Sequence, residues 1–520
     1  MNTPRILSTP GANAYAYPLL IRHLLANVAN QTDAEIVSGE LRFGYRAFVD
    51  RVTRLAALLT ARGVRAGDTV AVMDWDSHRY LECYFAIPMM GAILQTVNVR
   101  LSPAQIDFTL RQSGASFLLH HADFAPLCAQ LLLALPQIGG LIVMDGADED
   151  NDYEALIAAA SPDFIFGDFD ENAIATTFHT TGTTGDPKQV FFSHRQLVLH
   201  TIALAATLAN QPDGQGMRRT NVYMPMTPMF HVHAWGMPYV ATMLGVKQVY
   251  PGRYDPATLL ALKRREGVDF SHCVPTILRM LLDANAAGGD SLAPWTFVIG
   301  GSALPAALAQ EAEMAGITIL AGYGMSETGP VVALARGLQP DVAKCCRAGF
   351  PAILVQARID MDKGGELLLR APWLTQGYAT QPDSDTLWAD GWMHTGDVAA
   401  LDGDGALRIV DRLKDVIKSG GEWVSSVDLE DLLVALPGVA EAGVIAMPDA
   451  KWGERPVAFI VAARGAPPPD MDLLCVQLQQ HVASGRISRY AIPERLVLVE
   501  ALPRTSVGKI DKKALRAMLA

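Results

Sequence analysis

The chain has 520 residues, half of them hydrophobic, and a formal net charge of −12 at pH 7. This length can bury a large core divided among several subdomains. The negative charge provides no basic patch of the kind that binds nucleic acid or an anionic membrane. No stretch approaches the about 20 uninterrupted apolar residues of a membrane-spanning helix. The N-terminus has no signal-peptide pattern, so we expect a cytoplasmic protein.

The predicted elements alternate between helices and short apolar strands. We expect a helix over 55–62, then strands at 69–73, 116–120, 140–144 and 296–299. Helices rich in alanine and leucine separate these strands, and such alternation is typical of α/β proteins. We therefore predict an α/β fold whose large N-terminal domain is built from several αβ subdomains.

A small C-terminal lobe is expected after this domain. The apolar strand Ala406–Val410 gives way to a charged turn at Asp411–Lys414. The chain beyond this turn is long enough for an independent lobe. We predict an N-terminal domain over residues 1–411 and a C-terminal lobe over residues 412–520.

A loop rich in glycine and threonine follows the apolar stretch Ala173–Phe178. It reads His179-Thr180-Thr181-Gly182-Thr183-Thr184-Gly185-Asp186-Pro187-Lys188. Glycines let backbone N–H groups approach an anion, threonine hydroxyls add donors or reach a metal ion, and lysine supplies a charge. Pro187 and Gln189 depart from the Walker pattern, and the consequence of Gln189 is open. Taken alone, the stretch is equally compatible with an ordinary surface loop.

Four further motifs follow in a fixed order. They read Tyr323-Gly324-Met325-Ser326-Glu327-Thr328, His394-Thr395-Gly396-Asp397, Asp411-Arg412-Leu413-Lys414-Asp415 with Lys418-Ser419-Gly420-Gly421-Glu422, and Pro503-Arg504-Thr505-Ser506-Val507-Gly508-Lys509. Together with the threonine-rich loop they resemble the adenylate-forming superfamily, which contains acyl-CoA synthetases, luciferases and peptide-synthetase adenylation domains. The resemblance extends over nearly the whole chain. It implies that the C-terminal lobe is a small, mobile α+β unit that rotates about a hinge, here at Lys414, between an adenylation pose and a thioester-forming pose.

The resemblance implies that ATP first converts a carboxylate into an acyl-AMP with release of pyrophosphate. Because the attack brings anions together, catalysis consists mainly of positioning and charge neutralisation. The matching positions place Lys509 at the carboxylate and α-phosphate, Lys188 at the outer phosphates, and Glu327 with Thr183 at Mg²⁺. The matching positions for ATP and AMP are Thr180, Thr181, Gly182, Thr183, Thr184, Gly185, Gly301, Ser302, Ala303, Gly322, Tyr323, Gly324, Met325, Ser326, Asp397 and Arg412.

The segment Pro228–Gly236 matches the part of the family that lines the acyl site. It contains no acidic residue, whereas relatives that activate amino acids have an aspartate there as counter-charge for the ammonium group. This favours a simple carboxylic acid. Trp235, with Gly300, is expected to shape a pocket for a short to medium acyl chain or a compact aryl acid, and its alternative role is core packing. His231 is either a gate between the acyl and thiol channels or a core residue.

Coenzyme A is the expected acceptor, because the chain ends shortly beyond Lys509 without room for a carrier domain. The resemblance assigns the loop that enters the site after rotation to Lys418, Ser419, Gly420, Gly421, Glu422 and Trp423. A proline common in relatives is missing just beyond it, as in the branch with medium-chain fatty-acid and methylmercaptopropionate CoA ligases. Two alternatives stay open: an acyl-AMP ligase serving a separate carrier protein, and a non-catalytic acyl- or nucleotide-binding relative. A homodimer is one possible assembly that the sequence leaves undecided.

Overall fold

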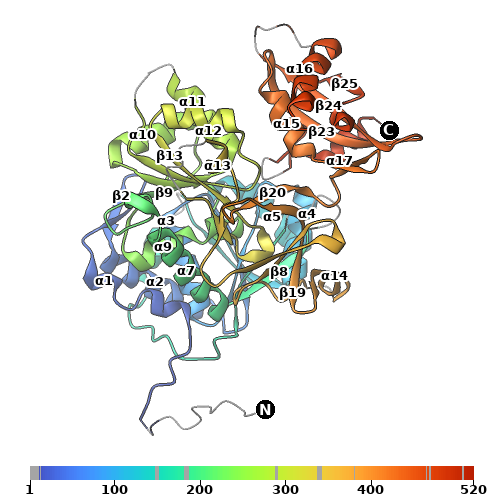
Figure 1. Cartoon of the computed structure of the whole chain (residues 1–520). Coiled ribbons are helices and arrows are strands. Elements are labelled where there is room, and N and C mark those ends of the chain that lie inside the picture. The colour runs from blue at the N-terminus through green and yellow to red at the C-terminus, as the bar shows by residue number, and fades with distance from the viewer. Residues whose placement is uncertain are drawn as a thin grey trace.

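The computed structural model describes residues 11, 13–146, 152–180, 187–286, 291–336, 342–379, 381–463, 465, 467, 470–505 and 509–519. A large body contains the first three sheets, and a smaller lobe, orange to red in Figure 1, stands on one side of it. The mixture of parallel sheets and helices confirms the expected α/β fold with its small C-terminal lobe. No helix in the described ranges is long and apolar enough to cross a membrane.

The first sheet has six strands in the order β6-β5-β3-β4-β7-β8, parallel except for the pair β7–β8. Its strands are β3 Thr69–Met73, β4 Ile93–Thr96, β5 Ala115–His120, β6 Gly140–Val143, β7 Ile174–His179 and β8 Gln189–Ser193. Its helices are α2 Tyr45–Ala61, α3 His78–Met89, α4 Pro103–Ser113, α5 Ala125–Ala134, α6 Tyr153–Ala159 and α7 His194–Ala209. The three strands predicted here are confirmed, whereas the helix predicted over 55–62 begins earlier, at Tyr45.

The second sheet has nine strands in the order β15-β14-β13-β12-β11-β9-β10-β1-β2, and the run from β13 to β1 is parallel. Its strands are β1 Glu35–Ser38, β2 Leu41–Gly44, β9 Val222–Pro225, β10 Lys247–Tyr250, β11 Phe270–Cys273, β12 Trp295–Ile299, β13 Ile317–Tyr323, β14 Ala333–Leu334 and β15 Phe350–Pro351. The neighbouring helices are α1 Val28–Gln31, α8 Val232–Trp235, α9 Met237–Leu244, α10 Pro256–Glu266, α11 Pro275–Ala286, α12 Ala306–Met314 and α13 Val342–Cys345.

Two antiparallel regions complete the chain on either side of the expected hinge. The third sheet contains β16 Gln356–Asp360, β17 Glu366–Arg370, β18 Trp388–Ala389, β19 Trp392–Leu401 and β20 Leu407–Arg412, with α14 Gln381–Leu387 nearby. The lobe contains β21 Ile417–Ser419, β22 Glu422–Val424, β23 Val439–Asp449, β24 Gly453–Ala462, β25 Arg495–Leu498, α15 Ser426–Val434, α16 Met471–Ala483 and α17 Lys512–Ala517. The third sheet therefore ends at Arg412, the first residue of the predicted lobe, and the sheet of the lobe begins at Ile417.

The largest core lies where the first two sheets and α2 and α3 meet. Every residue of β3 is buried, and α3 is buried along nearly its whole length, so neither presents a polar face to solvent. One charge is enclosed there: Glu82 accepts a hydrogen bond from Arg51 Nε at 2.6 Å and another from the Tyr153 hydroxyl at 2.5 Å. A buried carboxylate is tolerated when it is paired in this way. The core thus holds the two parallel sheets in a fixed relation, on which the site depends.

Candidate active site

The phosphate loop joins the antiparallel strands β7 and β8. The Thr180 N–H donates to the Lys188 carbonyl at 2.8 Å, which closes the loop at its base. Thr181, Gly182, Thr183, Thr184 and Gly185 lie outside the described residues, so their assignment rests on the sequence. Gln189 is buried, and its amide donates to Thr177 Oγ1 at 3.0 Å. This residue therefore ties the two strands together beneath the loop, which gives the departure at Gln189 a structural reason.

Glu327 shares a neighbour, Tyr378, with Lys188 at the end of this loop. It lies in the short helical turn Ser326–Thr328, just after the end of β13, and only 7% of its surface is exposed. The Tyr378 hydroxyl donates to Glu327 Oε1 at 2.6 Å, and Lys188 Nζ lies 5.0 Å from the centre of the Tyr378 ring. The structure thus brings the two predicted residues to one tyrosine, Glu327 to its hydroxyl and Lys188 to its ring. Tyr378 stands in no recognisable motif, so the sequence offered no signal for it.

Asp397 joins the second predicted cluster. Its Oδ2 accepts a hydrogen bond from the Tyr323 hydroxyl at 2.6 Å, and its Oδ1 lies 3.3 Å from Arg412 Nε. The pairing of β19 with β20 places Asp397 directly opposite Arg412. Burial and the Asp397 carboxylate raise the pKa of Tyr323, so this hydroxyl stays protonated and donates. The three residues assigned to the nucleoside are therefore neighbours.

Glu366 supports this cluster from β17. Its carboxylate accepts the Gly396 N–H at 3.0 Å and lies 2.8 Å from His394 Nδ1. It therefore orients the turn that carries Asp397. The sequence analysis missed Glu366, although a single acidic residue at the start of the apolar run Leu367–Leu369 was an available signal.

Glycines make the wall beside Tyr323. A Cβ atom on Gly300 would lie 2.8 Å from the Gly322 carbonyl oxygen and 3.3 Å from Trp235 Cη2. A Cβ atom on Gly324 would lie 1.3 Å from the Pro330 carbonyl oxygen. Larger residues would force these strand ends apart. Two of the other residues predicted for this wall, Ser302 and Ala303, are exposed, whereas Gly301, Met325 and Ser326 are partly buried. The Met325 N–H donates to Thr328 Oγ1 at 3.0 Å.

The acyl segment contains a left-handed turn. From Val232 to Gly236 the φ angles are 49, 53, 47, 59 and 73°, so α8 has the opposite hand to an ordinary helix. This conformation costs about 1–2 kcal/mol for each residue other than glycine, and such strain concentrates at functional sites. The turn places the two predicted residues His231 and Trp235 at its two ends.

Buried polar side chains hold the segment that leads into this turn. The Met229 N–H donates to Asp76 Oδ1 at 2.7 Å, and the Met229 carbonyl accepts the Tyr84 hydroxyl. Thr96 Oγ1 donates to the Phe230 carbonyl at 3.0 Å. These bonds come from the first sheet and its helix α3. They offset part of the strain by satisfying backbone groups that are closed off from water.

Trp235 is almost completely buried, with 5% of its surface exposed. Its ring approaches Gly300 on one side and lies 5.2 Å from the His272 ring. Burial lowers the pKa of His231 to about 3, and the charges of Lys509 and Arg100 act in the same direction. His231 is therefore neutral at physiological pH. Trp235 and Gly300 are neighbours, as the acyl-pocket assignment requires.

Lys509 enters this site from the C-terminal lobe. Two bonds join it to Thr505: its N–H donates to Thr505 Oγ1 at 3.2 Å, and the Thr505 N–H donates to its carbonyl at 2.8 Å. Burial lowers the pKa of Lys509 to about 8, and Arg412 contributes, whereas the charges of Asp397 and Glu327 oppose the shift. The structure therefore gathers Lys509, Asp397, Arg412 and Glu327, which the sequence spreads over 183 positions, into one site.

The predicted hinge lies between two anchors. The Leu413 N–H donates to the Gly396 carbonyl at 2.9 Å in the N-terminal domain. Asp415 pairs with Arg516 of the C-terminal lobe at 2.7 Å. Lys414 stands between them and is exposed. A pivot at Lys414 would leave both anchors intact.

The predicted CoA loop forms the hairpin β21–β22. Gly420 and Gly421 have φ angles of 62 and 85°, as a two-residue type I′ turn requires. Ser419 is buried, whereas Lys418, Gly421, Glu422 and Trp423 are exposed. In this pose Trp423 of the hairpin packs on Gly364, and the charges of Asp397 and Glu327 act on Lys509.

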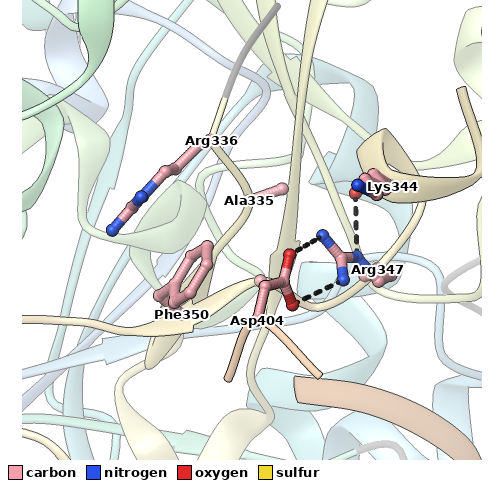
Figure 2. A pocket seen from close by; sticks show the side chains of 7 residues that line it. Ala335, Arg336, Lys344, Arg347, Phe350 and Asp404 are labelled. Atoms are coloured by element: carbon pink, nitrogen blue, oxygen red, sulfur yellow. Dashed lines mark hydrogen bonds and ion pairs between the residues drawn. The ribbon is translucent and has the colours of Figure 1, made fainter. Parts of the chain in front are cut away.

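A separate cavity of about 130 Å³ lies beside β14 and β15 (Figure 2). Its lining residues are Ala335, Arg336, Lys344, Arg347, Gly349, Phe350 and Asp404. Arg347 forms two 2.9 Å bonds to Asp404 and donates to the Lys344 carbonyl at 3.3 Å, and Arg336 lies 4.2 Å from the Phe350 ring centre. Its arginines are thus engaged by neighbouring side chains, and it contains none of the predicted site residues.

Comparison with known proteins identifies the arrangement. Residues 24–379 match the model of the AMP-binding enzyme family, and residues 428–509 match the AMP-binding enzyme C-terminal domain. The chain is 39% identical to a long-chain-fatty-acid–CoA ligase of Thermus thermophilus, with 93% of this chain and 92% of that enzyme covered. It is 35% identical to a 3-methylmercaptopropionyl-CoA ligase of Ruegeria pomeroyi, with 96% and 97% covered. The solved structure of Bacillus subtilis o-succinylbenzoate CoA synthetase with its acyl-adenylate intermediate matches with a TM-score of 0.78 and 26% identity, over 95% of this chain and 97% of that one.

Proposed function

We propose that this chain, which belongs to the AMP-binding enzyme family, is an ATP-dependent acid:CoA ligase that forms an acyl-AMP and then an acyl-CoA thioester. The observation that carries the proposal is the position of Lys509. This residue of the C-terminal lobe lies within the electrostatic reach of Asp397 and Glu327 of the N-terminal domain. A non-catalytic binding protein would have no need for a lysine delivered across two domains.

In the first step the acid carboxylate attacks the α-phosphorus of ATP and pyrophosphate leaves. Lys509 would neutralise the two anions that approach each other, which lowers the barrier because the charges converge only in the transition state. Lys188 would hold the outer phosphates. Asp397 would accept the ribose hydroxyls, since its oxygens retain lone pairs beyond those used by Tyr323 and Arg412.

Glu327 fits the role of a Mg²⁺ ligand. Its carboxylate shares the neighbour Tyr378 with Lys188, and Oε2 is left to bind a hard cation after Oε1 accepts the Tyr378 hydroxyl. Bound Mg²⁺ would withdraw negative charge from the phosphate oxygens. Thr183 is the proposed second contact, through its hydroxyl.

The proposed acid is a short- to medium-chain or compact aryl carboxylic acid. The support is the buried Trp235 against Gly300, which fills space where an acyl chain would otherwise extend. The absence of an acidic residue from 228–236 leaves no counter-charge for an amino group. A neutral His231 is compatible with an apolar acyl group beside it.

In the second step the lobe would rotate at Lys414 and the acyl group would pass to the CoA thiol. Rotation withdraws Lys509 and brings in the hairpin Lys418–Trp423, whose glycine turn would allow the pantetheine arm to pass close to the backbone. The thiol sulfur bonds to the acyl carbon, the bond to AMP breaks, and the thiol proton is lost to solvent.

The cytoplasm is the proposed compartment of this protein. A homodimer is the proposed assembly, and light scattering in solution tests it.

The test measures AMP and pyrophosphate release with ATP, Mg²⁺ and a panel of short, medium, branched and aryl acids, each with and without CoA. We expect turnover that requires CoA and one acid class. A single equivalent of acyl-AMP that CoA does not discharge would instead indicate delivery to a separate carrier protein. No reaction with any acid would contradict the proposal. As a control, Lys509→Ala should abolish pyrophosphate release while it still converts supplied acyl-AMP into thioester.

A further inference from the structure

Trp423, at the end of the β21–β22 hairpin, packs against a glycine of the N-terminal domain. A Cβ atom on Gly364 would lie 1.9 Å from Trp423 Cη2, 2.6 Å from Cζ3 and 2.7 Å from Cζ2. Such distances do not occur between real atoms, so the indole ring occupies the space of the missing side chain. A side chain at position 364 would therefore displace the indole ring from this position.

The turn that carries Gly364 has a defined shape. The Gly365 N–H donates to the Asp360 carbonyl at 2.8 Å, and the Gly364 N–H donates to the Met361 carbonyl at 3.3 Å. Gly364 itself has a φ angle of 72°. The turn therefore joins β16 to β17 as a firm surface, and β17 is the strand whose Glu366 orients the Asp397 turn.

Contacts within the lobe also hold Trp423 and its hairpin in place. Trp423 lies opposite Lys418 in the antiparallel pair, and Lys418 Nζ lies 5.4 Å from the centre of its ring. The Gly420–Gly421 turn and the bond from the Lys418 N–H to Glu454 at 2.7 Å fix the hairpin on the lobe. Even so, 47% of the Trp423 surface is exposed. An exposed tryptophan seated on a glycine is typical of a contact that can form and separate.

We propose that Trp423 and Gly364 form a docking contact that positions the C-terminal lobe with Lys509 inside the site. This inference rests on the proposed two-step function and names the residues that set the adenylation pose. The hinge at 413–415 and the bonds from Ser425 and Ser426 to β20 restrain the lobe beside the hinge. The Trp423–Gly364 contact adds a restraint at the turn between β16 and β17, so it fixes the angle at which Lys509 meets Asp397 and Glu327. Trp423 must leave Gly364 when the lobe rotates.

The test introduces a clash at the contact by Gly364→Ala. We expect acyl-AMP formation to slow about tenfold or more, while the conversion of supplied acyl-AMP and CoA into thioester changes by less than about twofold. Gly405→Ala is the matched control, because Gly405 also has a positive φ, of 83°, and has nothing within 4 Å of its Cβ position. It carries the same backbone penalty without a clash.

A second substitution gives the sharper result. Trp423→Ala removes the ring, so by itself it should also slow acyl-AMP formation. In the Gly364→Ala background the contact is already lost, so Trp423→Ala should slow acyl-AMP formation no further. The proposal would be overturned if Gly364→Ala slowed adenylation no more than Gly405→Ala, if both half-reactions fell together, or if the losses from the two substitutions were additive.

Hydrogen–deuterium exchange tests the contact without turnover. Trp423→Ala should increase exchange of the amides at 361–365 relative to the wild-type chain, while exchange in β23 stays unchanged. Unchanged exchange at 361–365 would contradict docking even in an active enzyme. Conversely, if the wild-type chain activates no acid, the proposed function fails while this measurement still reports whether Trp423 docks.

Discussion

The Tyr378 hydroxyl donates to Glu327 Oε1 at 2.6 Å, and the same ring lies 5.0 Å from Lys188 Nζ. One side chain from the segment before α14 therefore links the phosphate-loop lysine with the proposed metal ligand. These two residues come from different sheets, so the tyrosine sets the spacing between positive and negative charge at the outer phosphates.

Tyr378→Phe should weaken Mg²⁺ use. The substitution keeps the ring beside Lys188 and removes the donor that orients Glu327, a hydrogen bond to a charged group worth about 1.5–3 kcal/mol. We expect the rate of pyrophosphate release to fall about tenfold to a hundredfold, with a higher Mg²⁺ concentration at half-saturation. A Mg²⁺ titration at saturating ATP checks this. An unchanged half-saturation point would show that Tyr378 only packs against the loop.

The adenylation half-reaction should decline at alkaline pH. Lys509 acts as a cation, and its pKa in the free enzyme is lowered to about 8, so its charge is lost as the pH rises through this value. The profile of kcat/KM for ATP reports the free enzyme and should fall above about pH 8. In Lys509→Arg, whose guanidinium does not titrate in this range, the remaining activity should lose that alkaline limb. If kcat/KM declined above pH 8 in the same way in both enzymes, a group other than Lys509 would cause the decline.

Asp76→Asn should stabilise the protein at high pH. Burial raises the pKa of Asp76 to about 7, although the Met229 N–H bond opposes the shift. A carboxyl whose pKa is higher in the folded state binds more protons there, so it lowers stability progressively as the pH rises from about 4 to 7, by up to about 1.4 kcal/mol per pH unit. Asparagine stays neutral and can still accept from Met229.

Thermal unfolding of Asp76→Asn and the wild-type chain at pH 5 and pH 8 checks this expectation. The variant should gain melting temperature relative to the wild type at pH 8 and lose most of that gain at pH 5. A variant that is less stable at both values would show that the carboxylate charge itself, next to Arg100, is favourable in the fold.

Trp235→Ala should change the preferred acid. Its ring fills space between Gly300 and His272, so truncation enlarges the pocket, and kcat/KM should shift toward longer or bulkier acids. The KM for ATP should stay within about twofold, because the substitution leaves Asp397 and Lys188 untouched. Trp235→Phe is the control that retains most of the wall. An acid preference unchanged in the alanine variant would assign Trp235 to the core.

The family and reaction class followed from short motifs in the sequence. These motifs can be recognised because their function depends on consecutive residues. A phosphate loop needs glycines and hydroxyls in a row, and such a run, like His394–Asp397, can be identified without knowledge of the fold. The strands at 69–73 and 296–299 could also be predicted from the sequence, because each is a continuous apolar run between turn residues.

Other features depended on contacts between distant segments. Tyr378, Glu366 and Asp76 have no local pattern, since each acts through a partner that the tertiary fold supplies. The left-handed turn at 232–236 contains four residues that disfavour that conformation, so packing imposes it against local preference.

By itself, then, the sequence determined the family, the reaction and the residues with charge or glycine in fixed motifs, because those are properties of consecutive residues. Tertiary structure alone decided which residues meet. It brings Lys509 within range of the Asp397 charge, it brings Tyr378 to both Lys188 and Glu327, and it packs Trp423 on Gly364. Distances between segments far apart in the chain arise from how the sheets pack and how the lobe docks, and no local pattern encodes them.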